Sequence, residues 1–170
     1  MSFEIILFTA LAIIGIGSAI MMITRRNPVN SALFLILNFL ALAGLYLILH
    51  AQFLAVIQIA VYAGAIMVLV IFVIMLLNLG ELERLREGLS LKHYVAIVLG
   101  VLLLVALIPV LGASFQGKAL SISPAATDIG SVESMGESLL TTFLLPFELT
   151  SILLLAAIVG AVVLAKKKFP

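Results

Sequence analysis

The sequence predicts an all-α membrane protein built as a bundle of five transmembrane helices. Of its 170 residues, 65% are hydrophobic and 10% are charged, and the mean hydropathy is +1.39. A soluble domain of this length cannot hide so much apolar surface. The apolar runs show no strand-like alternation, so the backbone groups inside the membrane have to be satisfied within helices. We expect the whole chain, residues 1–170, to form a single membrane domain.

The composition also excludes several classes of function. A net charge of +1 gives no reason to expect an anionic partner, and we predict no contact with nucleic acid. The absence of cysteine excludes disulfides, thiolate metal sites and iron–sulfur clusters in this chain. The two histidines, His50 and His93, fall at predicted helix ends. No metal-ligand spacing, Ser/His/Asp arrangement or phosphate-binding glycine loop is present, so we predict no catalytic or metal centre here.

The first predicted helix covers residues 3–23, and a short charged loop that ends in Pro28 stops it. Its apolar run lacks a basic leading segment and a convincing cleavage site, so we treat it as a retained span rather than a signal peptide. The second predicted helix covers residues 30–50, with Asn30 or Ser31 as its N-terminal cap.

The third predicted helix, residues 53–78, follows the second after a very short connection. The two helices should therefore form a tight antiparallel hairpin. Asn38 lies inside the second helix and is expected to hydrogen-bond to a neighbouring helix.

The centre of the third helix combines one tyrosine with small residues. Those around Tyr62 are Ala60, Ala63, Gly64 and Ala65. Small residues let other helices approach closely, and Gly64 weakens the helix locally by about 1 kcal/mol on the soluble-helix scale. We therefore predict a soft point near the middle of this span.

Five side chains of this helix are candidates for function, and each has a simpler structural interpretation. Gln58 can bind water or a neighbour's carboxylate, but an ordinary interhelical hydrogen bond explains it equally well. Tyr62 can donate a hydrogen bond across the bundle or simply pack on a neighbour. Met67, Phe72 and Met75 form a dry gate in one interpretation and fill space in the other.

A polar segment, residues 79–92, separates the third helix from the fourth, which we predict over residues 93–111. Residues 112–137 contain the Gly, Ser and Pro typical of an irregular loop. The fifth predicted helix covers residues 139–165, and three lysines end it.

Glu148 is the one acid that falls well inside a predicted span. Pro146 removes a backbone donor two residues earlier and is expected to disturb the helix around Thr142. Glu148 is therefore a candidate carboxylate for a proton path inside the bundle. If the span starts near Pro146, Glu148 is instead an interfacial residue at the outer headgroup level.

The basic residues set the expected orientation. Eight of the nine fall on one side of a five-helix topology: Arg25, Arg26, Arg84, Arg86, Lys92, Lys166, Lys167 and Lys168. The positive-inside rule then places the N-terminus outside and the C-terminus in the cytoplasm.

Four stretches carry a resemblance to a known family. They are residues 26–29 (Arg-Asn-Pro-Val), 52–55 (Gln-Phe-Leu-Ala), 61–78 (beginning Val-Tyr-Ala-Gly-Ala-Ile-Met) and 145–161 (beginning Leu-Pro-Phe-Glu-Leu). Together they resemble the J subunit of the bacterial proton-pumping NADH:quinone oxidoreductase, respiratory complex I. The resemblance covers all five helices in order and is most specific in the third.

The resemblance implies a non-redox subunit of the membrane arm, located in the bacterial inner membrane. Its implied partners are the quinone-site subunit, the small K subunit and the first antiporter-like subunits. It further implies that this chain binds no cofactor, and that NADH, FMN, iron–sulfur clusters and quinone belong to partner subunits.

The resemblance also implies that the third helix can hold a π-bulge near Tyr62, which converts to regular α-helix during turnover. One inserted residue rotates everything beyond it by about 100°. Such a rotation would swing Met67, Val68 and Phe72 into or out of a water path. Gly64 and its alanine neighbours make the change sterically feasible.

Two roles of different kinds stay open. The chain couples quinone reduction to proton movement through its third helix, or it is a structural subunit that seals an interface and permits assembly. An independent small transporter is disfavoured because intramembrane charge is scarce. The polar candidates for a proton path are Glu148 and Gln58. We assign no proton transfer to Gln58, which stands where family members can carry an acid.

Overall fold

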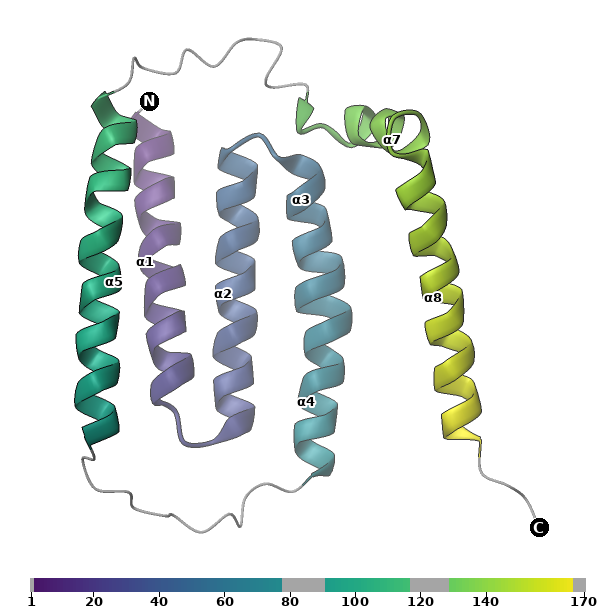
Figure 1. The fold of residues 1–170 in the computed structure, drawn as a ribbon, viewed down its shortest axis with the longest axis horizontal. Coiled ribbons are helices and arrows are strands. Elements are labelled where there is room, and N and C mark those ends of the chain that lie inside the picture. The colour runs from purple at the N-terminus through teal and green to yellow at the C-terminus, as the bar shows by residue number, and fades with distance from the viewer. Residues whose placement is uncertain (1, 78–90, 117–128, 167–170) are drawn as a thin grey trace.

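The computed structural model describes residues 2–77, 91–116 and 129–166, and the regular elements in these ranges are all helical (Figure 1). In chain order they are α1 (Ser2–Thr24), α2 (Pro28–Ile48), α3 (Gln52–Ile57), the π-helix η1 (Gln58–Ile66), α4 (Met67–Leu76), α5 (Leu91–Gln116), α7 (Val132–Leu140) and α8 (Leu144–Ala165). The prediction of an all-α chain is confirmed for these ranges.

Four helical segments are long and apolar enough to cross a membrane. They are Phe3–Thr24, Pro28–Ile48, Gln52–Leu76 and Leu144–Ala165, and α5 adds a shorter apolar stretch over Tyr94–Pro109. The third of these segments joins α3, η1 and α4 into one continuous rod (Figure 1). Residues 79–90 of the polar segment predicted over 79–92, and residues 117–128 of the loop predicted over 112–137, lie outside the described residues. α5 is longer at both ends than the helix predicted over 93–111.

The second helix begins at Pro28, two residues before its predicted start, and its cap is Asn27 rather than Asn30 or Ser31. Asn27 has an extended backbone, and its Oδ1 accepts hydrogen bonds from the N–H groups of Val29 at 2.9 Å and Asn30 at 3.4 Å. Pro28 occupies the first helical position, where a missing N–H leaves no bond unmade. The proline predicted only to stop one helix therefore also starts the next.

Polar side chains join α1 to α2 within the apolar layer. The amide nitrogen of Asn38 donates to the carbonyl of Gly15 at 2.7 Å and to the hydroxyl of Ser18 at 3.4 Å. The hydroxyl of Ser31 donates to the carbonyl of Met22 nearer the loop. The prediction that Asn38 bonds to a neighbouring helix is thus confirmed. Such bonds contribute about 0.6 kcal/mol each in membrane proteins.

A tight turn connects α2 to α3, as the short linker predicts. His50 has a φ of 58°, and its N–H donates to the carbonyl of Leu47 at 3.1 Å. The N–H of Ala51 donates to the carbonyl of Tyr46 at 2.9 Å. These two bonds and the left-handed residue form a Schellman ending, which satisfies the last carbonyls of α2. The third helix can therefore run back along α2.

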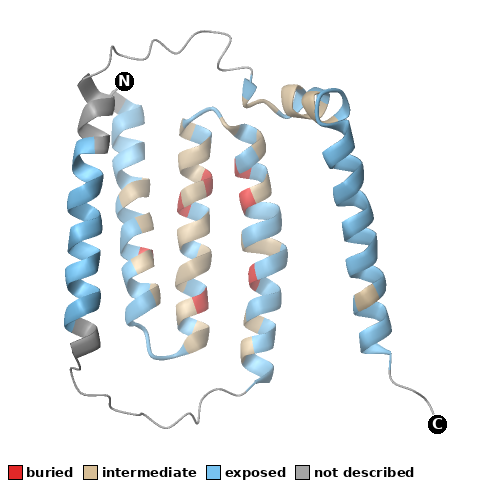
Figure 2. Cartoon of the chain, in the orientation of Figure 1, coloured by how far each residue is buried: buried red, intermediate tan, exposed pale blue. Residues whose placement is uncertain are grey.

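The interior of the described chain is narrow and lies along α2. Its buried residues are Ser18, Ala32, Ala41, Ala43, Ala55, Gln58 and Met67. Most are small, which lets helix backbones approach closely. α2 packs on α1 and also on α3, η1 and α4, whereas α5 and α8 have no buried residue among their described side chains (Figure 2).

The predicted fifth helix, 139–165, is divided in the structure. α8 begins at Leu144, and α7 covers Val132–Leu140, inside the predicted loop and across the start of the predicted helix. Ser131 caps α7, since its hydroxyl accepts from the N–H of Ser134 at 3.2 Å. The prediction missed α7 because the helix is short and carries Ser, Glu and Gly.

The disturbance that Pro146 predicts around Thr142 is present as a complete break, because α7 ends at Leu140, residues 141–143 form a turn and α8 begins at Leu144. Pro146 is the third residue of α8, and Thr142 lies in the turn before that helix. The first four N–H groups of a helix have no intrahelical acceptor, so a proline there removes no bond.

The start of α7 is fixed to the α2–α3 turn. The N–H of Phe53 donates to the carbonyl of Gly130 at 3.3 Å. A Cβ on Gly130 would collide with the carbonyl oxygen of His50 and lie 3.0 Å from the Cα of Ala51. Only glycine allows this approach, which holds the start of α7 beside the turn between α2 and α3, with α7 between the beginning of α3 and the beginning of α8 (Figure 1).

Candidate functional site

A nine-residue π-helix, Gln58–Ile66, lies in the middle of the Gln52–Leu76 span. At its end the N–H of Met67 donates to the carbonyl of Tyr62, five residues earlier. π-helices usually occupy a single turn and are frequent at functional sites. The structure therefore holds the wider winding at the position where the family resemblance implied a bulge near Tyr62.

Gly64 is suited to this winding for a steric reason. A Cβ at Gly64 would lie 3.2 Å from the carbonyl oxygen of Ile59, five residues earlier in the π-helix. That contact is tighter than Cβ atoms normally make, so a side chain would press against the backbone of the wide turn. Glycine also lowers the stability of a regular α-helix by about 1 kcal/mol relative to alanine. Both effects favour the π form over the α form.

The π-helix changes which residues face α2. Gln58 and Met67 are 8% and 3% exposed, and α2 packs along the whole of α3, η1 and α4. In a regular α-helix these two residues, nine apart, would be separated by about two and a half turns and would lie on opposite faces. Their common burial follows from the π winding. Gln58 is therefore an interior residue of the hairpin.

Tyr62 contacts the aromatic side chain of Phe39 on α2. The two ring centroids are 5.9 Å apart and the rings meet at 66°, an edge-to-face arrangement. Tyr62 is nonetheless 45% exposed, so its ring packs on α2 at the margin of the contact. This contact agrees with the packing interpretation of Tyr62 and marks the depth at which the π-helix meets α2.

The remaining gating candidates face outward. Val68 and Phe72 are 62% and 59% exposed, and they lie four residues apart on one face of α4. Unlike Met67, neither side chain is buried against α2 in the described residues. A water path bordered by Val68 and Phe72 would therefore run between this chain and a neighbouring subunit.

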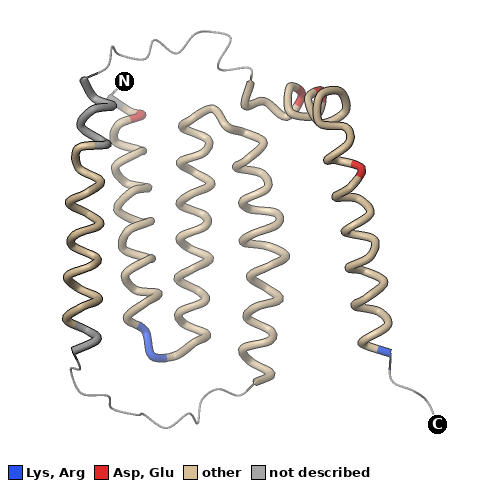
Figure 3. Tube along the Cα trace, in the orientation of Figure 1, with Lys and Arg blue, Asp and Glu red and all other residues tan. Residues whose placement is uncertain are grey.

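Glu148 lies on α8, away from the π-helix and from Val68 and Phe72 on α4. It is exposed in the second turn of α8, a helix that packs against α7 and stands apart from α3 and α4 (Figures 1 and 3). The hydroxyls of Thr150 and Ser151 both donate to the carbonyl of Phe147, at 2.8 and 3.0 Å. They are therefore occupied within their own helix and do not reach Glu148.

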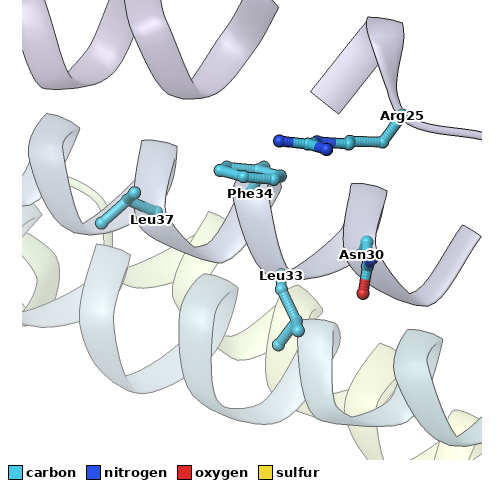
Figure 4. A pocket seen from close by; sticks show the side chains of 5 residues that line it. All are labelled: Arg25, Asn30, Leu33, Phe34 and Leu37. Carbon is cyan, nitrogen blue, oxygen red and sulfur yellow. The ribbon is translucent and has the colours of Figure 1, made fainter. Parts of the chain in front are cut away.

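Within the described ranges, no three His, Asp or Glu side chains are grouped so that they could hold a metal ion. Sequence reasoning missed one feature, an open cleft of about 480 Å³ lined by Arg25, Asn30, Leu33, Phe34 and Leu37 (Figure 4). The i, i+3, i+4, i+7 spacing of the four α2 residues places them on one face of the helix and could have been noticed in the sequence. The position of Arg25 over that face depends on the turn between α1 and α2, which the sequence does not show.

Comparison with known proteins identifies relatives along nearly the whole chain. The family model described as NADH-ubiquinone/plastoquinone oxidoreductase chain 6 matches residues 18–164. The chain is 40% identical over 166 residues to an NAD(P)H-quinone oxidoreductase chain 6 of Leptolyngbya boryana, covering 98% of this chain and 81% of the relative. It is 39% identical over 158 residues to the NADH-quinone oxidoreductase subunit J of Escherichia coli K12, covering 91% and 82%. For the subunit J of Rickettsia typhi the identity is 36% over 166 residues, covering 95% and 78%.

Proposed function

Because the chain belongs to the NADH-ubiquinone/plastoquinone oxidoreductase chain 6 family, which includes subunit J, we propose that it couples quinone reduction to proton translocation in the membrane arm of NADH-quinone oxidoreductase. In this proposal the chain is a non-redox subunit of the bacterial inner membrane. NADH, FMN, the iron–sulfur clusters and quinone are bound by other subunits. Its third helix is the moving part.

The observation that carries the proposal is the nine-residue π-helix at mid-span. A π-helix is less stable than an α-helix unless its surroundings hold it, so the segment has a second form available. Gly64 brings the two forms closer in free energy for two reasons. It avoids the close contact that a Cβ would make with the carbonyl of Ile59 in the π form, and it lowers the stability of the α form. A two-state element with a small energy gap is what a coupling device needs.

Conversion to the α form would rotate α4 about its own axis. With α3 held in place, Met67 would turn away from the face that carries Gln58 and would lie about half a turn from it in the α form. Leu69, eleven residues after Gln58, would take its place because eleven residues make about three turns. Val68 and Phe72 would turn with them. The rotation would wet or dry a passage bordered by neighbouring subunits, since apolar constrictions gate by dewetting.

The proposed surroundings follow from the family and from the charges. We place the chain beside the quinone-site subunit, the small K subunit and the first antiporter-like subunits, with the N-terminus outside and the C-terminus in the cytoplasm. Gln58 positions the helix by packing and carries no proton. Apart from Glu4 at the start of α1, Glu148 on α8 is the one carboxylate of the described spans that a neighbour's proton path could use.

The test is Gly64→Ala in the assembled complex. The added Cβ presses on the carbonyl of Ile59 in the π form and favours the α form by about 1 kcal/mol, roughly a fivefold shift in population. We expect a normal amount of complex on a native gel, with lowered quinone reductase turnover and lowered proton pumping in vesicles. Gly160→Ala is the matched control, because its Cβ meets nothing within 4 Å in α8.

The larger substitutions Gly64→Leu and Val68→Phe extend the series. Gly64→Leu would crowd the wide turn further, and Val68→Phe would change the outward face of α4 without touching η1. Normal turnover and pumping in Gly64→Ala and in both larger variants would count against gating.

A structural role is the second candidate, and the exposure of α5 and α8 favours it. Neither helix has a buried residue among its described side chains, so both need lipid or other subunits around them. If the chain only seals an interface, variants of Gly64 should reduce the quantity of complex and leave the pumping stoichiometry of the assembled fraction unchanged.

A further inference from the structure

The cleft at the start of α2 combines an apolar stripe with a fixed cation. Leu33 and Leu37 are 53% and 42% exposed, and with Asn30 and Phe34 they follow an i, i+3, i+4, i+7 spacing on α2. The guanidinium carbon of Arg25 lies 5.4 Å from the centroid of the Phe34 ring (Figure 4). The stripe begins at the helix end and runs into the apolar part of the span.

Stacking on Phe34 fixes the plane of the guanidinium and leaves its edge available. One edge nitrogen, Nη2, is 3.6 Å from the sulfur of Met21, a weak acceptor. Arg25 makes no ion pair with any residue that the structure describes, and Arg26 beside it adds a second positive charge. A planar fork whose N–H groups meet no carboxylate among the described residues suits the paired oxygens of a phosphate.

Acids and bases lie at opposite ends of the described helices. Arg25, Arg26 and Lys166 are at the end that holds the cleft, whereas Glu4, Glu133 and Glu137 are at the other (Figure 3). The end with the cleft therefore attracts anions. Its depth is also set, because Pro28 starts a membrane-length helix less than two turns before Phe34.

From this geometry we propose that the cleft binds one anionic phospholipid. The phosphate lies at the edge of the Arg25 guanidinium with the side chain of Asn30 beside it, and one acyl chain lies along Leu33, Phe34 and Leu37. A free anion would use the polar end alone and leave the apolar stripe unfilled. An acidic peptide would have to place part of its polar backbone at the depth of the hydrocarbon layer. A phospholipid matches both parts of the cleft, because its phosphate suits the polar end and its acyl chain suits the apolar stripe.

The full chain offers a spectroscopic test because it contains no tryptophan. Phe34→Trp places a single fluorophore in the cleft and keeps the stacking partner of Arg25, since Trp is the best ring for this contact. The protein is reconstituted in phosphatidylcholine vesicles that contain either brominated phosphatidylglycerol or brominated phosphatidylcholine at the same mole fraction. We expect bromine quenching to give an affinity about fivefold higher for the glycerol lipid than for the choline lipid, the effect of one arginine near a headgroup.

Two matched substitutions in the Phe34→Trp background locate the effect. Arg25→Gln should abolish the preference for phosphatidylglycerol, whereas Arg26→Gln, which removes the same charge outside the cleft, should keep most of it. Equal losses in the two variants would overturn the proposal, because they would indicate diffuse electrostatic attraction.

Three further outcomes would also overturn it. Equal quenching by the two lipids in the Phe34→Trp protein would mean that Arg25 does not bind the lipid phosphate and is neutralised in another way, such as by an acid of this chain. Displacement of the lipid by inorganic phosphate at matched ionic strength would indicate a simple anion site. A glycerol-lipid preference of the same size in a Leu153→Trp protein, with the fluorophore in the middle of α8, would mean that the enrichment is not local to the cleft.

Discussion

At the scale of single residues, the backbone at His50 and at Gly130 fixes how the helices are connected. His50 has the only positive φ among the described residues, and it ends α2 as the left-handed member of a Schellman turn. A non-glycine residue in that conformation is strained, because its Cβ approaches the following carbonyl oxygen. Gly130 then approaches the same turn more closely than any other residue could. These two positions fix where the hairpin turns and where α7 attaches.

We therefore expect His50→Gly to stabilise the protein. Glycine adopts a φ near 58° without strain, so the free energy of unfolding should rise by about 1 kcal/mol. The measurement is the shift of the unfolding midpoint in mixed micelles of rising denaturing-detergent fraction. Val56→Gly, inside α3, is the control and should be destabilising because glycine is a poor helix former at an interior position. An unchanged or lowered midpoint for His50→Gly would contradict this account.

At the scale of elements, the π-helix separates two segments with different attachments. α3 is tied to the turn and to Gly130, and Ala55 within it is 2% exposed. α4 has one buried residue, Met67, with Ile71 and Ile74 half-buried on the same face, and its other side chains are exposed. Rotation at η1 should therefore leave α3 in place and turn α4, because fewer contacts resist it there.

Disulfide cross-linking can follow that rotation in this cysteine-free chain. Ile36 lies three residues before Phe39 on the same face of α2, and Met67 lies five residues beyond the Tyr62 that Phe39 contacts. We expect Ile36→Cys to cross-link with Met67→Cys in the π form and with Leu69→Cys in the α form. In the assembled complex, the second pair should gain yield when NADH and quinone are added.

The Gly64→Ala substitution supplies the control for this measurement. It should raise the yield of the pair at 36 and 69 in the resting complex, since it favours the α form. If that pair forms neither during turnover nor in the Gly64→Ala background, the helix does not rotate and the coupling proposal fails.

At the scale of the whole molecule, the described chain is a row of helices rather than a compact bundle. Its shared interior lies along α2, and α5 and α8 have no buried residue among their described side chains (Figure 2). No soluble protein leaves membrane-length helices so uncovered. The proposed partner subunits would cover these helices, as expected for a chain whose relatives are named as subunits of NADH-quinone oxidoreductase.

The proposed orientation can be tested on the same cysteine-free background. Glu137→Cys lies on α7, and Arg26→Cys lies in the loop at the opposite end (Figure 3). In intact spheroplasts we expect an impermeant maleimide to label position 137 and to label position 26 only after permeabilisation. Leu153→Cys, in the middle of α8, should stay unlabelled in both conditions. The reverse pattern would place the N-terminus in the cytoplasm.

The membrane class, the apolar spans, the distribution of charge and the family can all be predicted without coordinates. Hydropathy, charge and motif spacing are local quantities, so they need no knowledge of which segments meet. The same holds for the soft point at Gly64, which follows from glycine's own helix propensity.

Features that depend on contacts between segments, or on the sign of a dihedral angle, are seen only in the three-dimensional structure. The cap at Asn27, the division of the last helix and the left-handed His50 each depend on the backbone path through a turn, for which residue type is a weak guide. The common burial of Gln58 and Met67, and the cleft beneath Arg25, require knowing how α2 lies against its neighbours. A periodic pattern identifies a face of a helix, but only packing tells what that face touches.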